Sequence, residues 1–324
     1  MRREGRQWLR HVSCLGTGRG IVCADFRVGA CMSEQNLGRY GIFSIGLRTE
    51  DPARAGELAE AAAELEELGF GAIWLGGSTA VRHAVPLVEA TKRITVATGI
   101  QSIWQYEATD TAAAFADLEA AHPGRFLLGL GVSHAKLAEE YRRPYSAMVA
   151  YLDALDAAGV PADRRVLAAL GPKMLRLSRD RAAGTHPYLV TPEHTAEARE
   201  ILGEGPLLAP ELKIIPEPDP ARARSLARAH LSFYLGLPNY TDNFLRLGFT
   251  DADLTDGGSD RLIDAVYAWG DDDRIRSRAE EFHSAGADHV ALQIIDERPD
   301  DAPPRRAWGR LAEVVGVSRP TARP

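Results

Sequence analysis

The chain has 324 residues, of which 45% are hydrophobic and 26% charged, so it can bury a large core and is unlike disordered, collagenous or coiled-coil sequences. Its 38 Lys and Arg residues are outnumbered by 45 Asp and Glu residues, which gives a net charge of −7. Binding to nucleic acid normally needs clustered positive charge, so no nucleic-acid partner is expected. No apolar run approaches the roughly 18 residues of a membrane span, so no membrane contact is expected either.

The first 37 residues differ from the rest of the chain. Residues 1–31 are rich in arginine, lack periodicity and contain no apolar stretch of the roughly 7 to 15 residues that a secretory signal requires. We predict a disordered extension over residues 1–37, with Met32 as a candidate natural start. All three cysteines lie in this segment at spacings that match no zinc pattern. The Cys-free remainder fits a reducing cytoplasm, which is the predicted location.

From Tyr40 onward, short apolar runs alternate with longer stretches of helical periodicity, which is typical of a parallel sheet built from βα units. Several helices are expected to open with a capping residue followed by proline, as at Asp51-Pro52. Helices are also expected over about 81–92, 145–158 and 304–315. The expected strands are residues 40–45, 72–75, 94–100, 126–132, 166–170, 187–190, 211–216 and 289–295.

These alternating elements match the length of a (β/α)8 TIM barrel, whose usual size is about 250 residues. A doubly wound open sheet is the alternative, although it normally has fewer strands and a Gly-rich first turn that is missing here. About 70 residues separate the last two strands, a length that suits a helical insertion forming a lid or a dimer surface. We predict one barrel domain over residues 38–317 and a frayed end over 318–324. Helices of the insertion are expected near residues 220–236, 259–269 and 272–285.

In such a barrel the functional groups follow the carboxyl ends of the strands. Two of the expected loops begin a helix there: Gly171-Pro172-Lys173 after the fifth strand and Thr191-Pro192-Glu193-His194 after the sixth. Free N–H groups and the positive end of the helix dipole attract phosphate at this position. An ordinary capped helix start is the alternative for both loops.

Five segments carry a resemblance to a known family: ITVATGI (94–100), PGRFLLGLGVSH (123–134), RPYSAMVAYLDALD (143–156), LAALGPKMLRL (167–177) and AGTHPYLVTPEHTAEAR (183–199). In order and spacing they resemble the bacterial luciferase-like superfamily, and especially its branch of oxidoreductases that use the deazaflavin coenzyme F420. The resemblance covers residues 38–315 and implies the luciferase-like TIM-barrel fold.

The resemblance also implies a cofactor site at the mouth of the barrel. The third strand of the family often ends in a bulge with a cis peptide between non-proline residues, against which the cofactor ring rests. The matching pair here is Gly99-Ile100, with Ser102 just beyond. The family binds phosphate with the loops after strands five and six. This implies cofactor contacts for Gly171, Pro172, Thr191 and His194.

Two positions depart from well-known members of the family. The sugar-phosphate dehydrogenases among them carry an acidic residue and a histidine after the second strand, whereas this chain has Gly76-Gly77-Ser78, so that substrate is not expected. Those relatives place a catalytic carboxylate after the fourth strand, where this chain has Ser133-His134. Histidine can exchange a proton near neutral pH, so His134 is the candidate catalytic residue and Ser133 a candidate cofactor contact. A hydrogen-bonded structural role is the alternative for His134.

The expected function is hydride transfer between coenzyme F420 and a small organic substrate, with no metal. Two alternatives stay open. One is an FMN-dependent monooxygenase that uses molecular oxygen and a separate reductase. The other is a catalytically silent paralogue that only binds the cofactor. The family further implies a homodimer.

Overall fold

The computed structural model describes residues 37–133, 143–298 and 303–317. Apart from Leu37, which is buried in the core, the predicted extension over 1–37 lies outside the described residues. The catalytic candidate His134 and the predicted frayed end at 318–324 also lie outside them. Within the described residues, no helix combines the length and the apolarity that crossing a bilayer would require.

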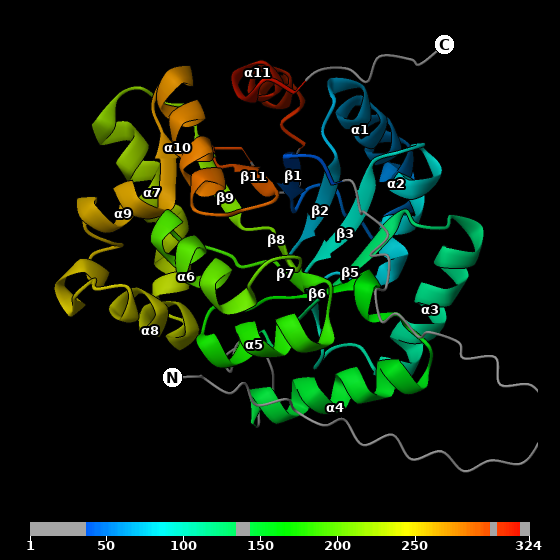
Figure 1. The fold of residues 1–324 in the computed structure, drawn as a ribbon. Helices are drawn as coiled ribbons and strands as arrows, with labels where there is room; N and C mark the ends of the chain where they lie inside the picture. The colour runs from blue at the N-terminus through cyan, green and yellow to red at the C-terminus, as the bar shows by residue number, and fades with distance from the viewer. Residues whose placement is uncertain (1–36, 134–142, 299–302, 318–324) are drawn as a thin grey trace, which may run out of the picture. The chain divides into compact units, whose positions relative to one another are not determined.

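A curled sheet of parallel strands forms the centre of the fold (Figure 1). Its order is β10-β9-β11-β1-β2-β3-β5-β6-β7-β8, with β4 paired to β5. Long apolar strands are expected in such a sheet because helices cover its outer face. The strands are β1 (Tyr40–Ser44), β2 (Ala72–Gly76), β3 (Thr95–Gly99), β4 (Gln101–Ser102), β5 (Phe126–Gly131), β6 (Arg165–Leu167), β7 (Gly184–Thr185), β8 (Leu207–Leu208), β9 (Glu211–Ile215), β10 (Tyr267–Trp269) and β11 (Val290–Ile294).

The sheet closes through β8 and β9, which are two parts of one segment separated only by Ala209-Pro210. β8 pairs with β7, whereas β9 pairs with β11 and so leads back to β1. The ladder continues across the break, because the Ala209 N–H donates to the Thr185 carbonyl (3.0 Å) and the Glu211 N–H to the Pro187 carbonyl (2.9 Å). The fold is therefore a barrel of parallel strands with helices outside it, as the sequence predicted.

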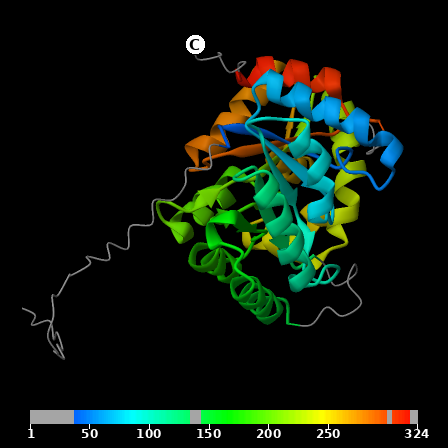
Figure 2. The same cartoon turned by 90° about the vertical axis from the view of Figure 1, so that its right-hand side faces the viewer.

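The helices pack around the outside of the sheet (Figures 1 and 2). On α1, for example, Leu58 and Leu65 are fully buried and face the strands. The first and last helices lie side by side, and Arg305 of α11 pairs with Glu64 of α1. The helices are α1 (Ala55–Leu68), α2 (Val85–Glu89), α3 (Ala108–Ala121), α4 (Pro144–Ala157), α5 (Pro172–Arg181), α6 (Pro192–Leu202), α7 (Pro220–Leu235), α8 (Pro238–Arg246), α9 (Asp260–Val266), α10 (Asp272–Ser284) and α11 (Arg305–Val315), with short 3-10 turns at Pro52–Arg54, Val81–Ala84, Ala162–Arg164 and Asp251–Leu254.

The predicted insertion before the last strand is confirmed, and it comprises α7, α8, α9, β10 and α10. One of its elements was predicted incorrectly. The helix expected over 259–269 ends at Val266, and the next three residues form β10, which pairs with the end of β9. Tyr267 and Trp269 are aromatic residues that favour a strand when an open sheet edge is available.

The sixth strand was also predicted at the wrong place. It was expected over 187–190, but the strand is β7 at Gly184–Thr185. Pro187 has no N–H to donate to a ladder, and Leu189 adopts a left-handed conformation (φ 57°), so the chain leaves the sheet there. A Cβ on Gly184 would lie only 1.9 Å from the Leu207 carbonyl oxygen, so the close approach of β7 to β8 requires glycine.

Candidate functional site

A cavity of about 740 Å³ opens at the carboxyl ends of the strands, between α5, α7 and α8. This volume lies within the range of roughly 300 to 1,000 Å³ that small-molecule sites occupy. Its wall is mainly apolar and aromatic, which suits a flat ring system. We call it the large cavity. Its aromatic lining residues are Phe43, Tyr145, Tyr188, Phe233, Tyr234 and Tyr240.

The end of β3 forms one wall of the large cavity. Gly99 and Ile100 both line it, and the peptide bond between them is cis, as the family resemblance predicted. A Cβ on Gly99 would lie 3.0 Å from Phe43 Cε2, so the bare glycine keeps this part of the cavity open. Ser102 is not among the lining residues; it is buried, and its N–H donates to Ser78 Oγ (3.2 Å).

The start of α5 also opens into the large cavity. Gly171, Pro172 and Lys173 line it, and no side chain caps the helix at Gly171. A Cβ at Gly171 would meet only open space. The first N–H groups of a helix have no partner within the helix, so this end is suited to bind an anion.

Two cations lie beside the start of α5. Lys173 Nζ is 4.0 Å from the centre of the Tyr145 ring. Arg246 of α8 also lines the large cavity, and its Nη2 donates to the Leu170 carbonyl at 3.0 Å. Its Nη1 pairs with Glu197. The helix start and both side chains thus place positive charge at the same part of the wall.

The start of α6, the second predicted phosphate loop, is not brought to the large cavity. Thr191 and His194 are buried, and the Thr191 hydroxyl caps the helix by accepting from the His194 N–H (3.3 Å). The His194 ring nitrogen Nε2 bonds to the Leu170 carbonyl (2.8 Å), and burial lowers the pKa of this histidine to about 4. These groups are hydrogen-bonded inside the protein. Their position therefore does not support the expectation that they contact a ligand.

The end of β5 contributes Ser133, which lines the large cavity with a left-handed backbone (φ 52°). Its carbonyl accepts from Asn239 Nδ2 of α8 at 3.3 Å. This bond ties the barrel strand to the inserted helices. His134, the predicted proton carrier, follows Ser133 directly but lies outside the described residues.

His186 is a site residue that the sequence analysis missed. It lines the large cavity from just beyond β7, and its ring stacks on Trp74 with the ring centres 4.0 Å apart. Burial lowers its pKa to about 3, so the ring is neutral at physiological pH. The motif AGTHPYLV contained this histidine, but the strand was predicted to begin after it.

A buried ion pair inside the barrel was missed as well. Lys213 and Glu211 of β9 are fully buried, and Lys213 Nζ lies 3.5 Å from the centre of the Tyr188 ring. Burial lowers the lysine pKa to about 8 and raises the pKa of Glu211. Residues two apart on a strand share a face, so the alternation in ELKII was the signal that could have placed both side chains inside.

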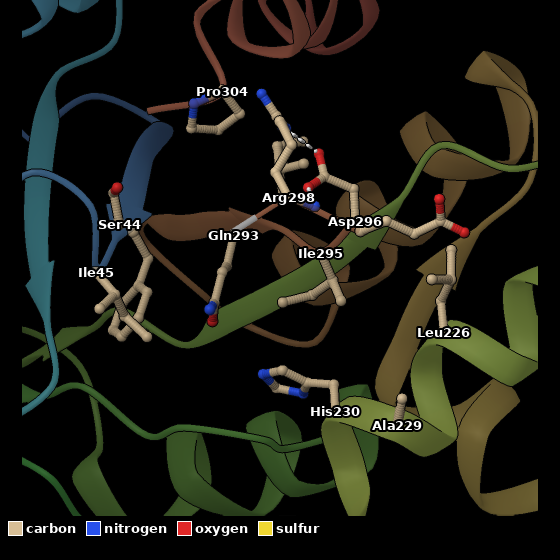
Figure 3. Close-up of a pocket in the computed structure, with 13 residues that line it drawn as sticks. Ser44, Ile45, Leu226, Ala229, His230, Gln293, Ile295, Asp296, Arg298 and Pro304 are labelled. Carbon is tan, nitrogen blue, oxygen red and sulfur yellow. Dashed lines mark hydrogen bonds and ion pairs between the residues drawn. The ribbon is translucent and has the colours of Figure 1, made fainter. Parts of the chain in front are cut away.

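Tyr188 links this pair to a smaller cavity of about 480 Å³ between α7 and the ends of β1 and β11 (Figure 3). The Tyr188 hydroxyl bonds to the Tyr234 hydroxyl (2.9 Å) and donates to Gln293 Oε1 (3.1 Å). Gln293 and His230 point toward one another in this smaller space. His230 Nδ1 bonds to the Tyr267 hydroxyl at 2.8 Å.

Comparison with known proteins agrees with this architecture. Residues 37–158 match the model of the luciferase-like monooxygenase family, while no curated protein matches the chain significantly. The predicted resemblance to the luciferase-like superfamily is thereby confirmed, for both the matched segment and the fold.

Solved structures show the same fold at low identity. An F420-dependent secondary alcohol dehydrogenase, in complex with an F420–acetone adduct, is 16% identical with a TM-score of 0.66, covering 87% of this chain and 99% of its own. The coenzyme F420-dependent tetrahydromethanopterin reductase from Methanopyrus kandleri is 15% identical (TM-score 0.64, 86% and 98% covered). The oxygenating constituent of 3,6-diketocamphane monooxygenase from Pseudomonas putida, in complex with FMN, is 14% identical (TM-score 0.61, 87% and 97% covered).

Proposed function

We propose that this protein is an oxidoreductase whose large cavity binds a phosphorylated tricyclic cofactor, with coenzyme F420 as the proposed cofactor and FMN as its alternative. The proposal rests on how residues are arranged in the wall of the large cavity. An aromatic and apolar space beside Gly99-Ile100 adjoins the uncapped start of α5. A flat ring and a phosphate on one molecule would match these two parts.

The residues present fit such a group. Gly99 lines the large cavity with bare backbone, so no side chain at this position stands in the way of a ring. Gly171, Pro172 and Lys173 would hold the phosphate at the helix start, and Arg246 would add charge from α8. Similar folds hold an F420 adduct in one solved structure and FMN in another, which supports both cofactors as candidates.

The bound cofactor would supply the hydride chemistry, and the chain's own residues would supply position and environment. The aromatic side chains would exclude water from the ring and from a small organic substrate beside it. We keep His134 as the proposed group that gives or takes a proton, because in the sequence it directly follows Ser133, which lines the large cavity. A homodimer and a reductase partner also stay proposals.

The test is a fluorescence titration of the full-length protein with F420 and with FMN in parallel, each against its form without phosphate. We expect micromolar binding of F420 and weaker binding of the phosphate-free form. A preference for FMN would favour the oxygen-using monooxygenase, and cofactor binding without turnover across a substrate panel would favour the silent paralogue. If neither cofactor binds, the proposed function is wrong.

A further inference from the structure

The imidazole of His186 is held rigidly in place beside the large cavity. Its ring lies nearly parallel to the Trp74 ring, at an interplanar angle of 12°. Trp74 is fixed in turn, because its Nε1–H donates to His289 Nε2 (3.0 Å) and His289 Nδ1 donates to the Gly38 carbonyl (2.8 Å). The side chain of His186 is only 1% exposed. A change of ring orientation would therefore break a packed, hydrogen-bonded interior.

The hydrogen bonds of this ring fix which nitrogen carries the proton. Nδ1 lies 2.7 Å from the Ala209 carbonyl oxygen, and a carbonyl can only accept, so Nδ1 must be the protonated nitrogen. In a neutral imidazole the other nitrogen, Nε2, is then an acceptor with a free lone pair. Among the described residues, Nε2 is buried and has no hydrogen-bond partner.

His186 lies in the wall of the large cavity, beside Gly99. Both residues line the cavity, and a Cβ on Gly99 would lie 3.3 Å from His186 Nε2. Because Gly99 has no Cβ, no side chain at this position fills the space beside Nε2. A buried acceptor without a partner costs folding stability, so the atom is expected to find its partner in a bound molecule.

We propose that His186 Nε2 accepts a hydrogen bond from the ring imide N–H of the tricyclic cofactor. The inference rests on the proposed function and extends it by naming the residue that recognises the ring itself. The acceptor requires a donor, and the imide N–H is the ring N–H that oxidised deazaflavins and flavins share. His186 is thus a specificity-determining residue that selects rings with an intact imide.

The experiment pairs two probes, FMN and 3-methyl-FMN, with the wild-type protein and the His186→Asn variant. Asparagine keeps a donor near the position of Nδ1, which can still bond to the Ala209 carbonyl, but it removes Nε2. In the wild type, methylation is expected to weaken binding about tenfold, the size of one buried hydrogen bond. In His186→Asn the two probes are expected to bind equally, each more weakly than FMN binds the wild type.

A second measurement keeps the test independent of how well the variant folds. In wild-type protein labelled with ¹⁵N-histidine, the Nε2 resonance of His186 is expected to move toward the protonated position when FMN binds. The resonance should not move in this way with 3-methyl-FMN. Binding of FMN without the shift, or equal affinity of both probes for the wild type, overturns this inference alone. Failure of both FMN and F420 to bind overturns the proposed function and the inference with it.

Discussion

Lys213 and Glu211 form an ion pair inside the barrel, with 2.6 Å between Nζ and Oε2 and both side chains fully buried. They lie two residues apart on β9 and so face the same way, and Lys213 lies against Tyr188, which lines the large cavity. Moving two charges out of water costs free energy, so each buried charge needs the other to compensate it. Removing either partner leaves an uncompensated charge in the core.

Lys213→Met is therefore expected to lower the free energy of unfolding by about 3 to 5 kcal/mol. The double variant Glu211→Leu, Lys213→Met should lose much less, because no unpaired charge is left behind. Arg39→Met is the matched control, since it breaks an ion pair with Glu280 in which both side chains are exposed and should cost less than about 1 kcal/mol. Urea denaturation measures all three, and equal losses for the single and double variants would contradict this account.

The buried histidines make stability depend on pH. Burial lowers the pKa to about 3 for His186 and His230 and to about 4 for His194 and His289. The unfolded chain binds protons near pH 6.5, where the folded chain still excludes them, so stability is present above pH 6.5 and is lost as the pH falls toward 4. Burial lowers the pKa of His283 as well, whereas Glu211 acts in the opposite direction.

The measurement is the urea midpoint between pH 7 and pH 4.5. Each histidine should contribute up to about 1.4 kcal/mol per pH unit to the decline. His194→Asn should show a shallower decline than the wild type, because one of the buried histidines no longer titrates. A midpoint that stays constant over this range would mean that the histidines are protonated in the folded protein.

The start of α5 is expected to bind the phosphate of the cofactor. Lys173→Met should weaken the binding of FMN or F420 by about three- to tenfold, and less so in high salt, because a charge-assisted contact is lost. Binding of riboflavin, which has no phosphate, should be unchanged. Lys92→Met, which removes an exposed cation that does not line the cavity, is the control and should change neither affinity. Equal weakening of riboflavin and FMN by Lys173→Met would place the phosphate elsewhere.

The start of α6 is expected to serve stability alone. Thr191→Ala removes the hydroxyl that caps the helix at the His194 N–H, and loss of such a cap typically costs about 1 kcal/mol. Thermal denaturation should report this loss, while cofactor affinity should match that of the wild type. If Thr191→Ala weakens cofactor binding as much as Lys173→Met, both helix starts contact the phosphate, as the family resemblance implied.

The sequence predicted the fold correctly where the local pattern of apolar runs and helix caps matches the elements of the barrel. Apolar runs separated by capped helices predicted most strands within a residue or two, since burial on both sheet faces requires such runs. The errors fell where tertiary contacts decide. β7 is placed by its pairing with β6 and β8, and β10 exists because β9 offers it an edge. Neither contact is encoded in a local pattern.

The candidate site was predictable only in part. Gly99, Ile100, Ser133, Gly171 and Pro172 all line the large cavity, because the carboxyl end of a barrel strand is a position that sequence order can locate. The two helix starts looked alike in sequence. The Thr191 side chain caps α6, whereas no side chain caps α5 and its start is left for a ligand. This difference depends on burial, which only the folded chain shows.

The most direct test of the central claim, that the large cavity is the cofactor site, is the affinity of full-length Gly99→Val for F420 and FMN. A Cβ at Gly99 would crowd Phe43 Cε2 at 3.0 Å and His186 Nε2 at 3.3 Å, and the added methyl groups would enter the cavity. Gly56→Val is the control, because a Cβ there meets nothing within 4 Å. We expect micromolar binding to the wild type and to the control, and binding at least about tenfold weaker to a folded Gly99→Val. Unchanged affinity in Gly99→Val would show that the cofactor binds elsewhere.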